Sequence, residues 1–115
     1  MHELPATKGM LDAALEAAQA AGATRVTAID VVIGDLSSIV GDSVQFYFDL
    51  LSRDTAASGA QLRVRRVAAR AECAACGGDY AVTLPLDPAC NRCGAVAVTI
   101  TGGREFYVDS IEVDE

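Results

Sequence analysis

The four cysteines of this 115-residue chain form two pairs with the same spacing. The segments CAACG and CNRCG each hold two cysteines separated by two residues and followed by glycine; the cysteines are Cys73, Cys76, Cys90 and Cys93. A C-x-x-C loop can direct both thiolates to one metal ion, and two such loops complete the tetrahedral set typical of structural zinc. The spacing therefore predicts a structural Zn(II) site at these four sulfurs.

Two other chemistries use the same cysteine spacing. Rubredoxin-type iron binds to similar loops, and paired thiols can undergo reversible oxidation. The opening residues show no basic stretch followed by an apolar run, so we expect no secretory signal and a reducing, cytoplasmic location in which disulfides are rare. Iron and thiol redox chemistry stay open as alternatives to zinc.

The single histidine of the chain, His2, is its second residue. The terminal amine, the His2 amide and the His2 imidazole can close two adjoining chelate rings around one ion. This planar, all-nitrogen set is the arrangement that Ni(II) and Cu(II) favour. Glu3 offers a fourth donor through its carboxylate or its amide. The alternative is that His2 is an ordinary terminal residue, because chain ends are usually mobile.

Several segments taken together resemble the HypA/HybF family, the nickel-insertion accessory proteins of [NiFe]-hydrogenase maturation. They are MHE at the start, VVIGDLSSIVGDSVQFYFDLLSRDT in the middle, the two C-x-x-C-G motifs, and FYVDSIEV near the end. The resemblance extends from Met1 to about Val113. It implies a nickel site at Met1, His2 and Glu3, beside structural zinc at the four cysteines.

The same resemblance implies what the protein does and with what it works. It implies a metallochaperone rather than an enzyme, which transfers Ni(II) together with a HypB-type GTPase to the hydrogenase large subunit. Some members also serve urease maturation, which would add urease accessory proteins as partners. Pro5 departs from the usual family pattern after MHE. Because proline has no amide N–H and should restrict Leu4 to extended geometry, it brings the role of Glu3 into question.

The charge balance argues against nucleic acid as a partner. Sixteen acidic residues against nine basic ones give a net charge of −7, which repels phosphate backbones. The segment RVRRVAAR is a local exception and suggests either the solvent face of a strand or a docking patch for an acidic partner. No run of 18 apolar residues is present, so we expect no membrane association. A zinc-ribbon module that binds protein or nucleic acid without transferring nickel is the alternative function.

The elements that would position these residues follow from hydrophobic periodicity and turn signals. They predict an α+β fold, in which two helices pack on a small mixed or antiparallel sheet, with an inserted zinc-knuckle subdomain that is similar to a zinc ribbon. Residues 1–72 and 101–115 would form the nickel-binding part, and residues 73–100 the zinc-binding part. The predicted elements are a helix from Pro5 to Gly22, a strand over 24–34, a helix over 42–54, a strand over 61–72 and a hairpin turning at Gly102 and Gly103.

Overall fold

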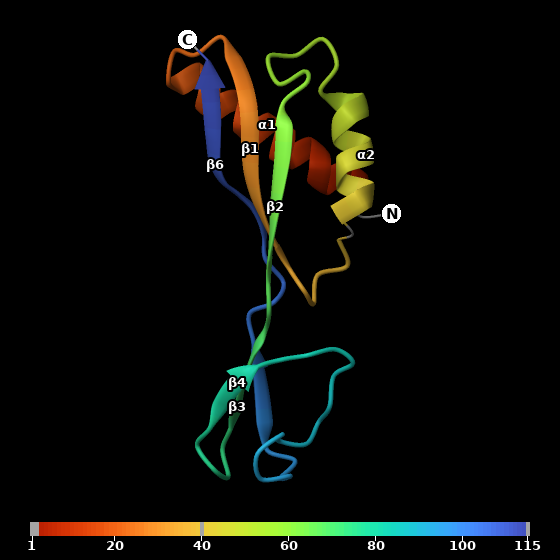
Figure 1. Cartoon of the computed structure of the whole chain (residues 1–115), viewed down its shortest axis with the longest axis vertical. Helices are drawn as coiled ribbons and strands as arrows, with labels where there is room; N and C mark the ends of the chain where they lie inside the picture. The colour runs from red at the N-terminus through yellow and green to blue at the C-terminus, as the bar shows by residue number, and fades with distance from the viewer. Residues whose placement is uncertain (1–2, 40, 115) are drawn as a thin grey trace.

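The computed structural model describes residues 3–39 and 41–114. It has two helices and six strands: α1 (Glu3–Ala20), β1 (Arg25–Gly34), α2 (Gly41–Leu51), β2 (Gln61–Val67), β3 (Arg70–Cys73), β4 (Asp79–Ala81), β5 (Val98–Thr101) and β6 (Phe106–Asp114). The molecule is elongated, with principal extents of 54 × 27 × 16 Å. Two lobes are joined by a narrow waist (Figure 1). We call residues 70–101 the cysteine lobe, and the remaining elements the helical lobe.

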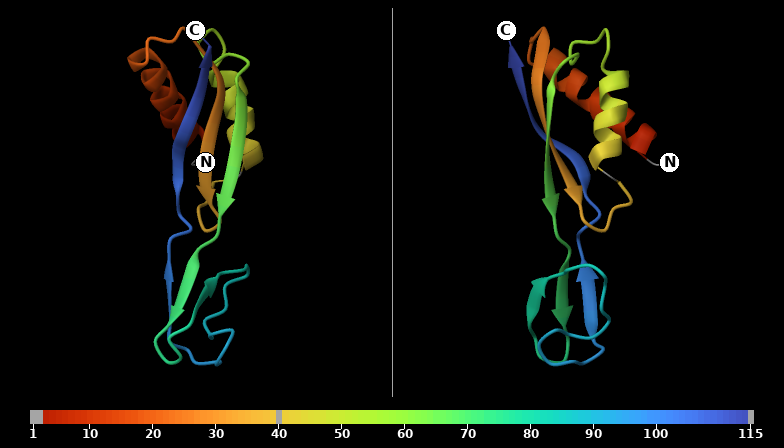
Figure 2. Two further views of the ribbon diagram at one scale, coloured as in Figure 1. Left: turned by 60° about the vertical axis from the view of Figure 1, so that its left-hand side comes forward. Right: turned by 45° about the vertical axis from the view of Figure 1, so that its right-hand side comes forward.

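The helical lobe is built on a three-stranded sheet in the order β2-β1-β6. Strand β1 pairs with β2 in parallel and with β6 in antiparallel orientation. The parallel pair needs a crossover connection, and α2 supplies it. Both helices pack against the same face of the sheet (Figure 2). The predicted α+β fold with two helices on small mixed and antiparallel sheets is therefore confirmed.

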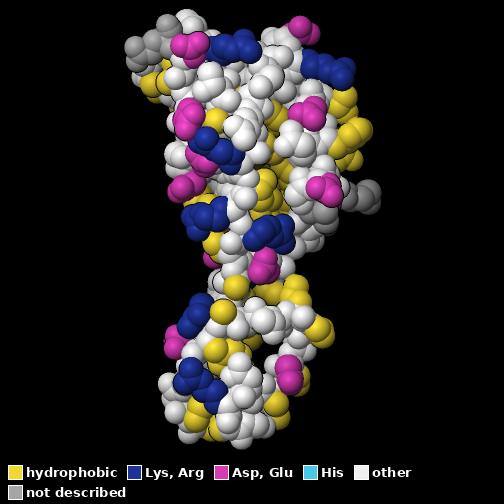
Figure 3. Space-filling view, viewed as in Figure 1, with side chains coloured by type: hydrophobic (Ala, Val, Ile, Leu, Met, Phe, Trp, Pro, Cys, Tyr) yellow, Lys and Arg dark blue, Asp and Glu magenta, His cyan; other side chains and the backbone are white. Residues whose placement is uncertain are grey.

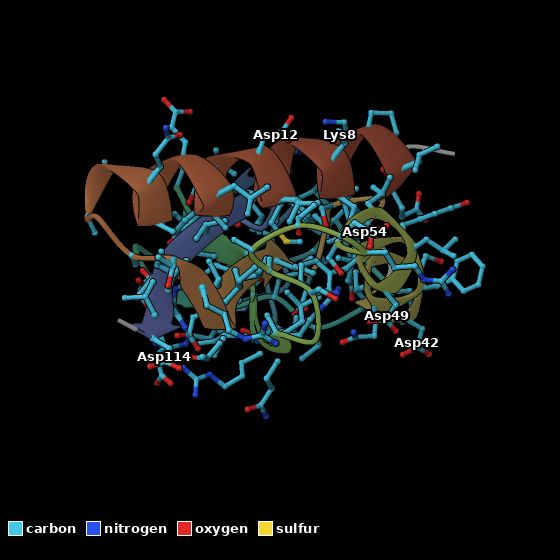
Figure 4. The ribbon with its side chains drawn as sticks, turned by 90° about the horizontal axis from the view of Figure 1, so that it is seen from above. Lys8, Asp12, Asp42, Asp49, Asp54 and Asp114 are labelled. Atoms are coloured by element: carbon cyan, nitrogen blue, oxygen red, sulfur yellow. The ribbon has the colours of Figure 1, made fainter. Side chains whose placement is uncertain are left out.

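The core of the helical lobe lies between the helices and this sheet. Helix α1 buries the stripe that its periodicity predicts, namely Met10, Leu11, Ala14 and Ala18. Helix α2 contributes Val44 and Phe48, and β1 contributes Ile29, Val31 and Ile33. The opposite side of α1 is polar. Lys8 and Asp12 point away from the sheet there (Figure 4) and form an ion pair of 3.0 Å.

Helix α1 begins at Glu3, two residues before Pro5. The expected extended geometry of Leu4 is therefore wrong, because Leu4 is already helical. The amides of the first helical turn have no acceptor within the helix, so a proline in that turn removes no hydrogen bond. None of the helices in the described ranges is long and apolar enough to cross a membrane.

The cysteine lobe is a second three-stranded sheet, in the order β4-β3-β5, with both pairs antiparallel. Its strands have only three or four residues. The hydrophobic residues buried in or next to this lobe are few and small: Ala69, Ala71, Cys73 and Cys90. Leu84 and Leu86 remain more than half exposed, at 58% and 53%. So small an apolar core indicates that the cysteines must contribute to holding this lobe together.

Several predicted elements differ from the structure. The strand expected over 61–72 is two strands, because the chain leaves the first sheet after Val67 and enters the second at Arg70. The hairpin predicted at Gly102 and Gly103 is wrong. Both glycines have positive φ angles, 68° and 84°, but β5 and β6 belong to different sheets and do not pair with each other. The second helix also ends earlier than expected, at Leu51.

The face of the first sheet that the helices leave open carries an ionic network. Arg63 on β2 donates two hydrogen bonds to Asp30 on β1, of 2.8 and 2.9 Å. Arg63 also pairs with Glu112 at 2.8 Å, and the Ser110 hydroxyl donates to Asp30. Basic and acidic side chains are interspersed on this side of the lobe (Figure 3).

The arginines of RVRRVAAR are thus largely engaged within the chain. Arg63 binds Asp30, Arg66 pairs with Asp35 at 3.3 Å, and Arg70 pairs with Asp79 at 3.1 Å. These contacts favour the interpretation of the segment as a strand with a solvated, ion-paired face. They leave little free positive charge for an acidic partner.

Asp30 should make the helical lobe sensitive to acid. The hydrogen bond from Arg63, and then that from Ser110, lower the Asp30 pKa from its ordinary 3.8. A carboxyl with a lowered folded pKa stabilises the fold above its unfolded pKa and loses this effect as pH falls towards the folded pKa. We expect Asp30→Asn to lower the urea midpoint at pH 7, and the difference from wild type to shrink below about pH 4.

The measurement is urea unfolding followed by helical circular dichroism, with all proteins metal-free. Asp109→Asn is the control, since Asp109 is exposed on β6 and its side chain makes no ion pair or hydrogen bond with the described residues. A difference between Asp30→Asn and wild type that is the same at pH 7 and pH 3 would contradict the assignment.

Candidate metal sites

The four cysteines converge from two loops at the far end of the cysteine lobe. Their Sγ atoms all lie within 4.8 Å of one another. Cys73 Sγ and Cys93 Sγ are 3.6 Å apart, and Cys76 Sγ and Cys90 Sγ are 3.8 Å apart. A tetrahedral ion with metal–sulfur bonds of about 2.3 Å requires sulfur–sulfur distances of about 3.8 Å. The four sulfurs therefore fit a structural metal site.

The two cysteine loops have the same backbone geometry. The Gly77 amide donates to the Cys73 carbonyl, and the Gly94 amide donates to the Cys90 carbonyl, both at 2.9 Å. Gly77 and Gly94 have φ angles of 72° and 76°, which residues with a side chain rarely adopt. These glycines close each loop behind its second cysteine, as the repeated C-x-x-C-G pattern predicts.

Backbone amides around the cluster favour ionised sulfur. The Cys76 amide is the main cause of a lowered pKa at Cys73. The amides of Cys93 and Arg92 lower the pKa of Cys90 to about 6. Because amide N–H groups stabilise thiolates, these two buried sulfurs are prepared as ligands before any ion arrives.

The fourth sulfur shows why the cluster needs a cation. The Ala95 amide lowers the pKa of Cys93, but the neighbouring sulfurs, first that of Cys73, together with desolvation outweigh it and raise this pKa to about 11. Four thiolates this close repel one another, so without a cation the last one keeps its proton. A divalent ion removes that repulsion, and all four sulfurs can then bind as thiolates. The sulfur–sulfur distances are far above the disulfide length of about 2.05 Å, and the four thiols are free.

Of the three predicted nickel ligands, only Glu3 is among the described residues, and it lies in the helical lobe. Met1 and His2 are outside the described residues, so this part of the prediction stays a prediction. Glu3 is the first residue of α1, and its carbonyl accepts a hydrogen bond from the hydroxyl of Thr7. Thr7 is fully buried, so this bond anchors the turn of helix that directly follows His2. Sequence reasoning missed Thr7, although a threonine four residues after a helix start can bond in this way.

A family profile matches residues 1–113 of the chain and is described as "Hydrogenase/urease nickel incorporation, metallochaperone, hypA". The hydrogenase maturation factor HypA of Caldanaerobacter subterraneus subsp. tengcongensis is 41% identical over 115 residues, which cover 99% of this chain and 100% of the relative. The protein of the same name from Geobacter metallireducens is 38% identical over 114 residues, with coverage of 99% and 100%.

The fold matches a solved structure as well. The solution structure of the Ni metallochaperone HypA from Helicobacter pylori superimposes with a TM-score of 0.69. It covers 98% of this chain and 97% of that one, at 22% sequence identity. The shared architecture agrees with the full-length similarity to the curated relatives. The chain belongs to the HypA family of metallochaperones for hydrogenase and urease nickel incorporation.

Proposed function

We propose that this chain binds Ni(II) at Met1, His2 and Glu3 and delivers it for maturation of [NiFe]-hydrogenase. The family profile covers the MHE segment together with both cysteine loops, and this match carries the proposal. The chain offers no second histidine, so the nitrogen donors that Ni(II) favours must come from His2 and the backbone around it. Thr7 supports the proposal, because it holds the helical turn that starts at Glu3.

The partners follow from the same role. Nickel would be exchanged with a HypB-type GTPase and released to the hydrogenase large subunit, or through urease accessory proteins where urease is the client. Transfer of an ion between ligand sets breaks no covalent bond in the chain, so no catalytic residue is required.

The cysteine lobe would hold Zn(II) as a permanent structural ion. Four thiolates in a closed tetrahedron are typical of structural zinc, and the sulfur–sulfur distances of 3.6 and 3.8 Å suit it. Residues 73–100 would then form the zinc-binding part, with residues 1–72 and 101–115 as the nickel-binding part. A closed site retains its metal, whereas a site at a chain end can exchange its ligands one at a time.

The test is equilibrium dialysis of untagged, zinc-loaded protein against Ni(II), with both metals counted by elemental mass spectrometry. His2→Ala is compared with Gln19→Ala, a neutral exchange at an exposed position of the same lobe. We expect about one nickel per chain in wild type and in Gln19→Ala, none in His2→Ala, and about one zinc in all three. Equal nickel in all proteins would remove His2 from the site. Absence of nickel from all three proteins would favour a zinc-ribbon interaction module without nickel transfer.

A further inference from the structure

The waist consists of two connectors, residues 68–69 between β2 and β3, and residues 102–105 between β5 and β6. One turn of the helical lobe, residues 34–37, contacts both connecting segments. The Asp35 amide donates to the carbonyl of Val67, directly before the first connector, at 2.8 Å. The Leu36 amide donates to the carbonyl of Gly103, within the second connector, at 2.6 Å. The turn therefore contacts the chain at both places where it passes from one lobe to the other.

The contacts between the turn and the connectors leave no space for further atoms. A Cβ atom added to Gly103 would lie 2.6 Å from the Ala69 Cβ and 3.1 Å from the Leu36 Cγ. A Cβ atom added to Gly34 would lie 2.2 Å from the Gly103 carbonyl oxygen. Real Cβ atoms essentially never approach another atom closer than 3.0 Å, so the 2.6 and 2.2 Å contacts require glycine at both positions.

Further hydrogen bonds extend from the waist into each lobe. The Gly34 amide donates to the Glu105 carbonyl at 2.7 Å, next to the start of β6. Ala69 is 1% exposed, and its carbonyl accepts from the Val82 amide of the cysteine lobe at 2.8 Å. The turn is closed in itself, because the Ser37 hydroxyl donates to the Gly34 carbonyl at 2.7 Å. The 34–37 turn is thus tied to both lobes through the two connectors.

We propose that the 34–37 turn is a clasp that holds the two lobes in one orientation, and that they swing relative to each other only when the bond between Leu36 and Gly103 opens. Two single connectors without cross-links would behave as a flexible joint. The hydrogen bonds and glycine contacts of the clasp convert that joint into a rigid one. The clasp therefore sets the position of the cysteine lobe relative to the lobe that carries the MHE segment.

One buried oxygen atom, on Glu105, destabilises the closed clasp. Glu105 Oε1 is buried and has no hydrogen-bond partner among the described residues. It would lie 2.6 Å from a Cβ atom on Gly34. A buried oxygen without a partner is destabilising, and opening the waist would expose it to water. The backbone hydrogen bonds of the clasp therefore stabilise the closed joint, and the buried Glu105 oxygen destabilises it. Because these two effects oppose each other, the joint can open as well as close.

The test measures tumbling of the lobes by 15N relaxation on the zinc-loaded full chain. Gly103→Ala is compared with Gly102→Ala. Both glycines have positive φ angles, so alanine strains the backbone in both variants. An added Cβ at Gly102, however, meets only Glu105 Oε2, at 3.4 Å. Comparing these two variants therefore separates the effect of backbone strain from the effect of disrupting the clasp.

We expect wild type and Gly102→Ala to tumble as single elongated bodies. In Gly103→Ala the two lobes should show separate, shorter correlation times, and the Leu36 amide should exchange with solvent about tenfold faster than in Gly102→Ala. Zinc content and the protection of the β1 amides report that both lobes remain folded. Independent tumbling of the lobes in wild type would overturn the proposal, even if Gly103→Ala did not fold. Identical behaviour of the two folded variants would overturn it as well.

Discussion

Replacing Cys90 with serine is expected to abolish metal binding at the cysteine cluster and to unfold the cysteine lobe. Cys90 is buried, and its Sγ lies 3.8 Å from that of Cys76. Serine oxygen is a poor substitute for thiolate at a four-sulfur site. The lobe has strands of three or four residues and few buried side chains. A structural zinc contributes about 10–16 kcal/mol in isolated modules, far more than such a core supplies.

The measurement is zinc content by elemental mass spectrometry together with amide hydrogen exchange. Ala75→Ser is the control, because it introduces a hydroxyl into the same loop at an exposed position without removing a sulfur. We expect Cys90→Ser to lose zinc and the protection of β3, β4 and β5, while β1 stays protected. Retention of a full zinc equivalent, or loss of protection in both lobes, would contradict the role assigned to the cluster.

Replacing Phe48 with alanine is expected to destabilise the helical lobe by about 3–5 kcal/mol, because it leaves a cavity in a tightly packed core. Phe48 is 1% exposed and is the largest fully buried side chain among the described residues. It lies on α2 within the hydrophobic cluster that also contains Met10 and Leu11 of α1. A loss of this size approaches the total stability of many small domains.

Phe46 on the same helix provides the matched control. It is 60% exposed, so Phe46→Ala should change the free energy of unfolding by at most about 0.5 kcal/mol. Urea unfolding of the zinc-loaded proteins, followed by helical circular dichroism, gives both values. Equal destabilisation by the two substitutions would show that α2 is not packed on the core through Phe48.

The two lobes rely on different stabilising forces. In the helical lobe, aliphatic side chains and Phe48 fill a core between two helices and a sheet. In the cysteine lobe, four sulfurs take the place of such a core. Metal removal should therefore act mainly on one lobe, and core substitution mainly on the other. Under the proposed function, the structural ion and the transferred ion would then occupy different lobes.

The sequence by itself determined the features that depend on local spacing. The buried stripe of α1 follows from hydrophobic periodicity, which reports which side of a helix faces a core. The strand β1 follows from its richness in valine, isoleucine and threonine. The cysteine cluster follows from two C-x-x-C-G motifs, because each loop presents its two sulfurs through local backbone geometry alone. The family was recognisable from the combination of these motifs with MHE. The outcome for Met1 and His2 awaits the nickel measurement.

Only the tertiary structure decided how the chain crosses between the lobes. Gly102 and Gly103 carry the signals of a hairpin turn, but local signals do not state whether the flanking strands pair with each other or join separate sheets. Whether these strands pair is set by contacts between residues distant in sequence. Examples are the hydrogen bond from Leu36 to Gly103 and the packing of Gly103 on Ala69. The break of the predicted strand after Val67 has the same cause. Such contacts leave no periodicity in the sequence, because each is set by two chain segments that meet only in the folded molecule.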